Sequence, residues 1–201
     1  MWDTRVVLIL LRHGQTPNNA EARLQGQVDS PLDDVGITQA KIAGEYIRSR
    51  WPVDGVVTSS LTRTRQTVEY AGFGEHPLVV DDRWREIDFG EFDRRRIKEV
   101  IAHLTERWRE DADYAPDGGE SMASMHDRVV EACEQLSSRA VERNVLVVTH
   151  ATPIKSAAVW ALGGPVSMIL NMWVNLGTIT VLGDVRGEFL LQEFNIQLDE
   201  D

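Results

Sequence analysis

The chain has 201 residues, of which 42% are hydrophobic and 26% charged, and its formal net charge is −11. These values favour one ordinary globular domain and disfavour a nucleic-acid partner, because duplex binding rests on a basic surface. No apolar run approaches the roughly 20 residues of a membrane span, no leader pattern opens the chain, and the lone Cys133 excludes an internal disulfide. We therefore expect a cytoplasmic protein with no membrane partner. The oligomeric state stays open, with a homodimer among the options.

The first half of the chain alternates buried-strand patterns with helical periodicity. Thr58, Ser59 and Ser60 offer hydroxyl groups as N-caps for the second of its helices. The predicted elements are a strand at 6–11, a turn-rich loop at 17–34, a helix after Gly36 that Pro52 ends, a strand at 53–57, a helix at 61–70 and a strand at 78–80.

The second half begins with an acidic and aromatic stretch of no regular pattern at 84–92. After it we predict a helix at 94–109, a polar loop at 111–119, a long helix at 120–142, a strand at 145–148, a helix at 153–162 and strands at 178–182 and 189–194. This order predicts a three-layer α/β/α sandwich with a mainly parallel sheet. We expect the last two strands to form a hairpin, which would add an antiparallel edge. We expect one domain over 1–201, with 84–121 as a substrate-side cap.

Two of the predicted core strands end in histidine. Arg12, His13 and Gly14 follow the first strand, and His150 follows the strand at 145–148. Ligands of open α/β sheets bind at the carboxyl ends of the strands. If these two strands are parallel neighbours, His13 and His150 meet at one edge of the sheet.

This combination of residues suits chemistry on a phosphoryl group, which needs fixed cations and donors around its oxygens. His13 is the candidate nucleophile and Glu86 the candidate acid for the leaving oxygen. Asp88, Glu91 and Asp93 lie close to Glu86 and remain alternatives for that role. The phosphate-binding candidates are the cations Arg12, Arg23 and Arg63, the neutral donors Thr16, Asn19 and Gln25, and His150 with the backbone N–H groups that follow it.

Six motifs in order resemble those of the histidine phosphatase superfamily, also called phosphoglycerate-mutase-like, and the resemblance covers most of the chain. They are Arg12-His13-Gly14-Gln15-Thr16 with Asn19, Arg23-Leu24-Gln25-Gly26, Ser59-Ser60-Leu61-Thr62-Arg63, Glu86-Ile87-Asp88 with Gly90, Gly118-Gly119-Glu120-Ser121 and Val147-Val148-Thr149-His150.

The resemblance implies a phosphatase that forms a phosphohistidine on His13 and acts on a small phosphorylated metabolite. Arg12, Arg63 and His150 would form the phosphate pocket with help from Asn19, and Glu86 would protonate the leaving group and then activate water. The loop motif adds Gly26 to the phosphate-binding set. Ala151 stands where glycine is common in the family and keeps the backbone N–H. No metal and no cofactor are implied.

The sequence departs from the common pattern after the acid motif, where it runs Asp93-Arg94-Arg95-Arg96. Residues 152–155 resemble the phosphatase domains fused to ribonuclease H, whereas 108–118 resembles glucosyl-3-phosphoglycerate phosphatases, so the organic portion of the substrate stays open. One alternative is a cofactor-dependent phosphoglycerate mutase, which the short chain and the missing Arg-His-Gly-Glu-Ser motif disfavour. The other is a non-catalytic module that binds phosphate esters.

Overall fold

The computed structural model describes residues 7–139, 143–185 and 187–198. These residues form a six-stranded sheet in the order β3-β2-β4-β1-β5-β6. Its strands are β1 (Val7–Arg12), β2 (Gly55–Thr58), β3 (Leu78–Val80), β4 (Val145–Thr149), β5 (Ile179–Val185) and β6 (Glu188–Ile196).

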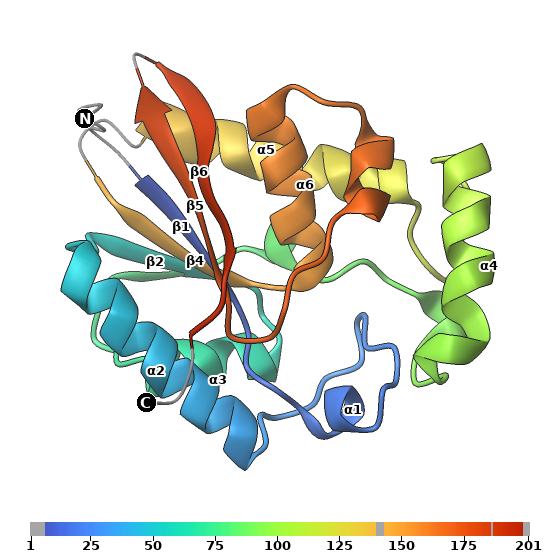
Figure 1. The fold of residues 1–201 in the computed structure, drawn as a ribbon, viewed down its shortest axis with the longest axis horizontal. Helices are drawn as coiled ribbons and strands as arrows, with labels where there is room; N and C mark the ends of the chain where they lie inside the picture. The colour runs from blue at the N-terminus through green and yellow to red at the C-terminus, as the bar shows by residue number, and fades with distance from the viewer. Residues whose placement is uncertain (1–6, 140–142, 186, 199–201) are drawn as a thin grey trace.

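Helices cover both faces of the sheet (Figure 1). Helices α2 and α3 lie on one face and α5 and α6 on the other, while α4 stands away from the sheet at one end of the molecule. The helices are α1 (Pro17–Ala20), α2 (Asp34–Arg50), α3 (Thr62–Tyr70), α4 (Ile97–Glu110), α5 (Met122–Arg139) and α6 (Ala151–Leu162), with short 3-10 helices η1 (Asp82–Trp84), η2 (Gly90–Phe92) and η3 (Val166–Asn171).

The sheet confirms the predicted fold class. Strand β1 pairs in parallel with β4, and Arg12 lies opposite Thr149 in that register. Strands β5 and β6 form the predicted hairpin, and β5 pairs antiparallel with β1. The two strands that end in histidine are therefore neighbours, and their carboxyl ends lie side by side.

Strand β1 is buried on both faces, which explains its continuous apolar sequence. Successive side chains of a strand point to opposite faces. Leu8 and Leu10 accordingly belong to the core beneath α5 and α6. Ile9 and Leu11 belong to the core beneath α2. This burial fixes the register of β1 and with it the position of the residues that follow.

Several predicted boundaries differ from the structure. The loop at 17–34 contains the one-turn helix α1, because Thr16 and Asn19 form a reciprocal capping box. Helix α2 begins before Gly36, since Asp33 caps it by accepting a hydrogen bond from the Gly36 N–H. Helix α3 has Leu61 as its N-cap, with no side-chain cap. Val6 and residues 140–142, which we assigned to a strand and a helix, lie outside the described residues.

We did not predict η3, which follows the left-handed Gly163 at the end of α6. Within the described ranges, no helix has the length and apolar character that crossing a bilayer requires.

Candidate active site

The carboxyl ends of β1 and β4 bring His13 and His150 together, as the sequence predicts. The two ring centroids are 5.1 Å apart, with an interplanar angle of 63°. The backbone N–H of His13 donates to the Thr149 carbonyl at 3.0 Å, which extends the β1–β4 pairing to the histidine itself. Both side chains are buried, and His13 is 3% exposed.

The protonated nitrogen of His13 follows from its hydrogen bond. Nδ1 lies 2.7 Å from the carbonyl oxygen of Gly14. A carbonyl can only accept, so Nδ1 carries the proton and Nε2 keeps its lone pair. Burial lowers the pKa of His13 well below its usual value, and the positive charges of Arg63 and Arg12 lower it further. A neutral imidazole with a free Nε2 is the form that a nucleophile needs.

Glycine is required at position 14 for packing. A Cβ on Gly14 would lie 2.2 Å from the carbonyl oxygen of Gly36. The strand end therefore packs directly against the backbone of the first turn of α2, and any side chain at either position would force the two apart.

His150 is held from both sides. Its Nδ1 accepts a hydrogen bond from Nε of Arg63 at 3.2 Å. That assigns the ring proton to Nε2, which lies 2.9 Å from Oγ of Ser59. Burial, followed by the charge of Arg63, lowers the pKa of His150 well below its usual value. His150 is thus a neutral ring behind His13 with both nitrogens bonded to protein groups.

Two buried arginines flank the histidine pair. Arg63 is fully buried, and its Nη1 and Nη2 donate to the carbonyls of Val28 at 2.9 Å and Gly26 at 2.8 Å. Arg12 donates from Nη1 to the Val174 carbonyl at 2.6 Å, while its buried Nε has no partner among the described residues. Burial lowers the pKa of each arginine to about 10, so both remain cationic near neutrality. The free Nε of Arg12 is a donor that an anion would satisfy.

Glu86 lies in the same cavity as Arg12 and His13. Its carboxylate accepts hydrogen bonds from the backbone N–H of Ile87 at 2.9 Å and of Thr152 at 3.3 Å. The side chains of Asp88 and Asp93 instead accept from the backbone of Gly90 and Gly26. Among the four carboxylates that the sequence left open, Glu86 is the one that lines this cavity.

The cavity has a volume of about 270 Å³, and α4 and the segment around η3 form its outer wall. Apolar side chains form most of this outer wall: Ile97, Ile101, Trp108, Ile169, Leu170, Met172 and Trp173. Lys155 of α6 also lines the cavity, where burial lowers its pKa. In the sequence, Lys155 stood out only as part of a motif; its position near the start of the helix that His150 caps was the available signal.

The remaining predicted site residues divide into two groups. Asn19, Arg23, Gln25 and Ala151 line the cavity. Arg23 does so while paired with Glu21 at 2.7 Å. Thr16, Gly26, Arg63 and His150 are not among the lining residues and bond to groups beside the cavity.

The hydroxyl group of Thr16 donates a hydrogen bond to Oε1 of Gln25 at 2.7 Å. The carbonyl oxygen of Gly26 accepts a hydrogen bond from Nη2 of Arg63. The described part of the chain contains no cluster of three or more His, Cys, Asp or Glu side chains that could hold a metal ion.

Residues 8–197 match the family model of the histidine phosphatase superfamily, branch 1. The chain belongs to this superfamily. A glucosyl-3-phosphoglycerate phosphatase of Mycolicibacterium vanbaalenii is 33% identical to it over 194 residues, which span 90% of this chain and 86% of the relative. The structure of a mycobacterial glucosyl-3-phosphoglycerate phosphatase with VO3 superimposes with a TM-score of 0.81 at 29% identity, covering 95% of this chain and 99% of that one.

A Salmonella choleraesuis protein with the provisional name of phosphoglycerate mutase is 36% identical over 169 residues, which span 81% of this histidine phosphatase and 74% of that relative. Other mycobacterial relatives are longer, and the chain spans 49% of their length at 32% identity. The comparisons confirm the predicted superfamily, the fold and the enzyme class of a phosphoric monoester hydrolase.

Proposed function

We propose that the chain is a metal-independent phosphatase that hydrolyses a small phosphate monoester through a phosphohistidine at Nε2 of His13. The observation that carries this proposal is that His13, with a free Nε2, lines one cavity together with Arg12 and Glu86. The buried Nε of Arg12 has no hydrogen-bond partner among the described residues. Nucleophile, anion site and acid are the three parts that phosphoryl transfer without a metal requires.

The reaction has two steps. In the first, Nε2 of His13 attacks phosphorus, the ester P–O bond breaks, and Glu86 gives its proton to the leaving oxygen. In the second, Glu86 takes a proton from water, the water oxygen attacks phosphorus, and the P–N bond breaks to release inorganic phosphate. Arg12 and Arg63 stay charged throughout and balance the phosphoryl oxygens. His150 has a supporting role: its ring packs against His13 and is bonded to Arg63 and Ser59.

We propose further that the substrate carries a carboxylate beside its phosphate. A phosphate dianion balances Arg12 and Arg63, and Glu86 must be neutral to act as an acid. Lys155 then faces the cavity as an uncompensated cation, and its ammonium group has no ion pair or hydrogen bond within the described residues. The name of the M. vanbaalenii relative, a phosphoglycerate derivative phosphatase, supports this class. In this proposal α4, within the predicted cap at 84–121, and the segment around η3 enclose the organic portion.

The stability of the trapped phosphoenzyme in acid and in alkali distinguishes this mechanism from others. Rapid quenching of the enzyme with a radiolabelled phosphate ester should trap label that is stable to alkali and released by acid, the behaviour of a phosphohistidine. His13→Ala should trap no label and release no phosphate. Label retained by His13→Ala would refute the assignment, and binding without turnover in the wild type would favour a non-catalytic module.

A phosphoglycerate mutase is the second candidate, since a relative with that provisional name matches the chain. Isomerisation of 3-phosphoglycerate, assayed with and without 2,3-bisphosphoglycerate, separates the two activities. We expect phosphate release to exceed isomerisation. Efficient isomerisation with negligible phosphate release would replace the phosphatase proposal.

A cytoplasmic location and a small-molecule partner belong to the same proposal. The single cysteine and the net charge of −11 support them. Subcellular fractionation of the native host tests the location.

A further inference from the structure

The segment that carries Glu86 is held by side chains that do not line the cavity. Residues 83–86 run from the end of the short 3-10 helix η1 into irregular chain, and each of their four carbonyl oxygens accepts a side-chain hydrogen bond. Oγ1 of Thr149 donates to the Trp84 carbonyl at 2.6 Å. The other three carbonyls are bonded to a single residue, Arg128 of α5.

Arg128 uses its complete set of N–H groups in this arrangement. Nη1 donates to the carbonyls of Arg83 at 2.6 Å and Arg85 at 2.8 Å, and Nη2 reaches the Glu86 carbonyl at 3.3 Å. Nε and Nη2 donate to the two carboxylate oxygens of Glu120 at 2.7 and 2.8 Å. A guanidinium has five N–H donors, so none is left for a ligand. This distinguishes Arg128 from Arg12, which lines the cavity and whose buried Nε has no partner among the described residues.

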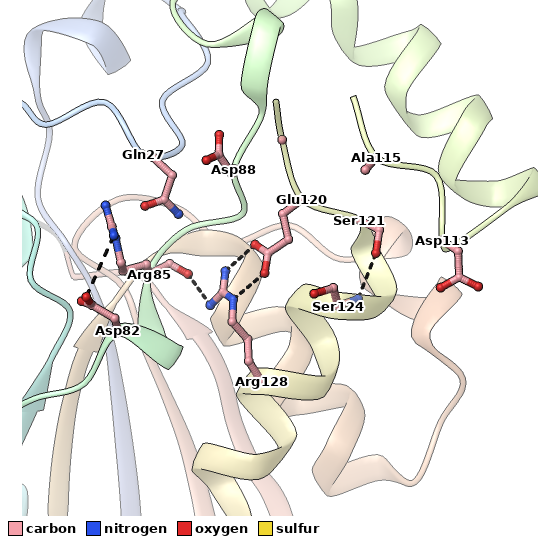
Figure 2. Close-up of a pocket in the computed structure, with 11 residues that line it drawn as sticks. Gln27, Asp82, Arg85, Asp88, Asp113, Ala115, Glu120, Ser121, Ser124 and Arg128 are labelled. Atoms are coloured by element: carbon pink, nitrogen blue, oxygen red, sulfur yellow. Dashed lines mark hydrogen bonds and ion pairs between the residues drawn. The ribbon is translucent and has the colours of Figure 1, made fainter. Parts of the chain in front are cut away.

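Glu120 in turn is tied to the same stretch of chain. Its backbone N–H donates to the Asp88 carbonyl at 2.9 Å. Figure 2 shows its carboxylate facing the guanidinium of Arg128, with Arg85 and Gln27 beside them. Gln27 adds a second donor to the Glu86 carbonyl at 2.7 Å. The Arg128–Glu120 pair is only 19% and 18% exposed, so solvent screens it weakly.

We propose that Arg128, oriented by Glu120, is a positioning residue that fixes the backbone of Glu86 so that its carboxyl group faces the phosphoryl group on His13. The reason is geometric. A general acid acts at hydrogen-bond distance from the leaving oxygen, and a displacement of about 1 Å can cost about 100-fold in rate. The chain leaves its last 3-10 hydrogen bond at Arg85, so Glu86 needs donors from other segments to hold its position within that tolerance. This inference rests on the proposed function, in which Glu86 protonates the leaving group.

The leaving group provides the test. The alkoxide that leaves 3-phosphoglycerate needs a proton, whereas the phenolate of 4-nitrophenyl phosphate leaves without one. We measure kcat/KM, which reports the steps up to the first irreversible one and excludes the later use of Glu86 as a base. Arg128→Lys should lower kcat/KM for the alkyl ester by about 30-fold and for the aryl ester by less than about threefold. Misplacing the acid should cost less than losing it, which typically costs about 100- to 10,000-fold. Glu120→Gln should show the same selectivity with a smaller loss.

A double-mutant cycle shows whether Arg128 acts through Glu86. In the Glu86→Gln background, Arg128→Lys should cause almost no further loss on the alkyl ester, because the group that it positions is gone. Arg50→Lys is the matched control, since Arg50 forms an arginine–glutamate pair with Glu193 far from this segment. Thermal unfolding of every variant establishes that it is folded, and Glu120→Gln serves if Arg128→Lys is not.

Each outcome has one meaning. Equal losses on both esters, or additive losses with Glu86→Gln, would show that Arg128 has a purely structural role and would overturn the proposal. If His13→Ala retains the wild-type rate, the proposed function itself fails, and the Arg128 variants do not decide that question.

Discussion

Nε of Arg63 donates a hydrogen bond to Nδ1 of His150 at 3.2 Å. This contact joins the first turn of α3 to the end of β4, and it determines which nitrogen of His150 carries the ring proton. The proton lies on Nε2, next to Ser59. A neutral His150 and a cationic Arg63 can therefore share the buried space behind His13.

Arg63→Lys should reduce both activity and stability. A lysine ammonium cannot bond to His150 and to the carbonyls of Gly26 and Val28 in the fixed directions of a guanidinium. Because Arg63 is fully buried, we expect kcat/KM to fall about 100-fold and the free energy of unfolding to fall by about 2 kcal/mol.

Steady-state kinetics and urea denaturation measure the two effects of Arg63→Lys. Arg65→Lys is the control, because Arg65 is an exposed arginine on the same helix. Activity within about twofold of wild type would exclude Arg63 from the phosphate site.

Stability should decline as the pH falls below the pKa of unfolded histidine, about 6.5. Burial holds the pKa of His13 and His150 well below that value, so the folded protein keeps both rings neutral while the unfolded chain binds protons. Each histidine then removes up to about 1.4 kcal/mol of stability per pH unit below about 6.5 and contributes nothing above it.

Urea denaturation at about pH 7.5, 6.5 and 5.5 measures this dependence. His13→Asn and His150→Asn should each reduce the slope of the unfolding free energy against pH. His103→Asn, at an exposed histidine, is the control. If both the His13→Asn and the His150→Asn variants keep the wild-type slope, the two histidines are not neutral in the folded protein.

Lys155→Met should discriminate between substrates with and without a carboxylate. The substitution keeps most of the apolar length of the side chain and removes its charge. We expect kcat/KM for 3-phosphoglycerate to fall about tenfold, equivalent to about 1.4 kcal/mol, with little change for glycerol 3-phosphate. Lys41→Met, at an exposed lysine of α2, is the control. Equal losses on both esters would instead place Lys155 at the phosphate.

Removal of divalent metals should leave turnover unchanged. In the proposed mechanism, Arg12 and Arg63 supply the positive charge that a metal would otherwise provide. Dialysis against EDTA followed by a phosphate-release assay should give activity within about twofold of the untreated enzyme. A loss that added Mg²⁺, Mn²⁺ or Zn²⁺ restores would overturn the mechanism.

The sequence predicted the framework of the site because the signals were local. The continuous apolar runs that precede His13 and His150 are typical of strands buried on both faces, and the alternation with helices predicted a parallel sheet. Pairing of those two strands followed from the fold class, and the structure confirms it. Element boundaries were less accurate where capping decided them, as with Asp33 at the start of α2.

The tertiary structure decided what each of these residues faces. Glu86, Asp88, Glu91 and Asp93 are indistinguishable as neighbouring carboxylates in the sequence, and only the path of the chain between η1 and η2 brings Glu86 to the cavity. Arg63 resembles a surface helix residue in sequence, and its complete burial arises from contacts with the distant 26–28 loop and His150.

The sequence by itself thus predicted the superfamily and its enzyme class, since residue types and the order of short motifs are sufficient for that. Tertiary structure alone decided the protonated nitrogen of each histidine, the carboxylate that shares the cavity, and the hydrogen bonds of Arg128 to the chain around Glu86. These properties depend on hydrogen bonds between segments far apart in the chain, such as the 42 residues that separate Arg128 from Glu86. No pattern in the sequence records such distances, because packing of the whole domain determines them.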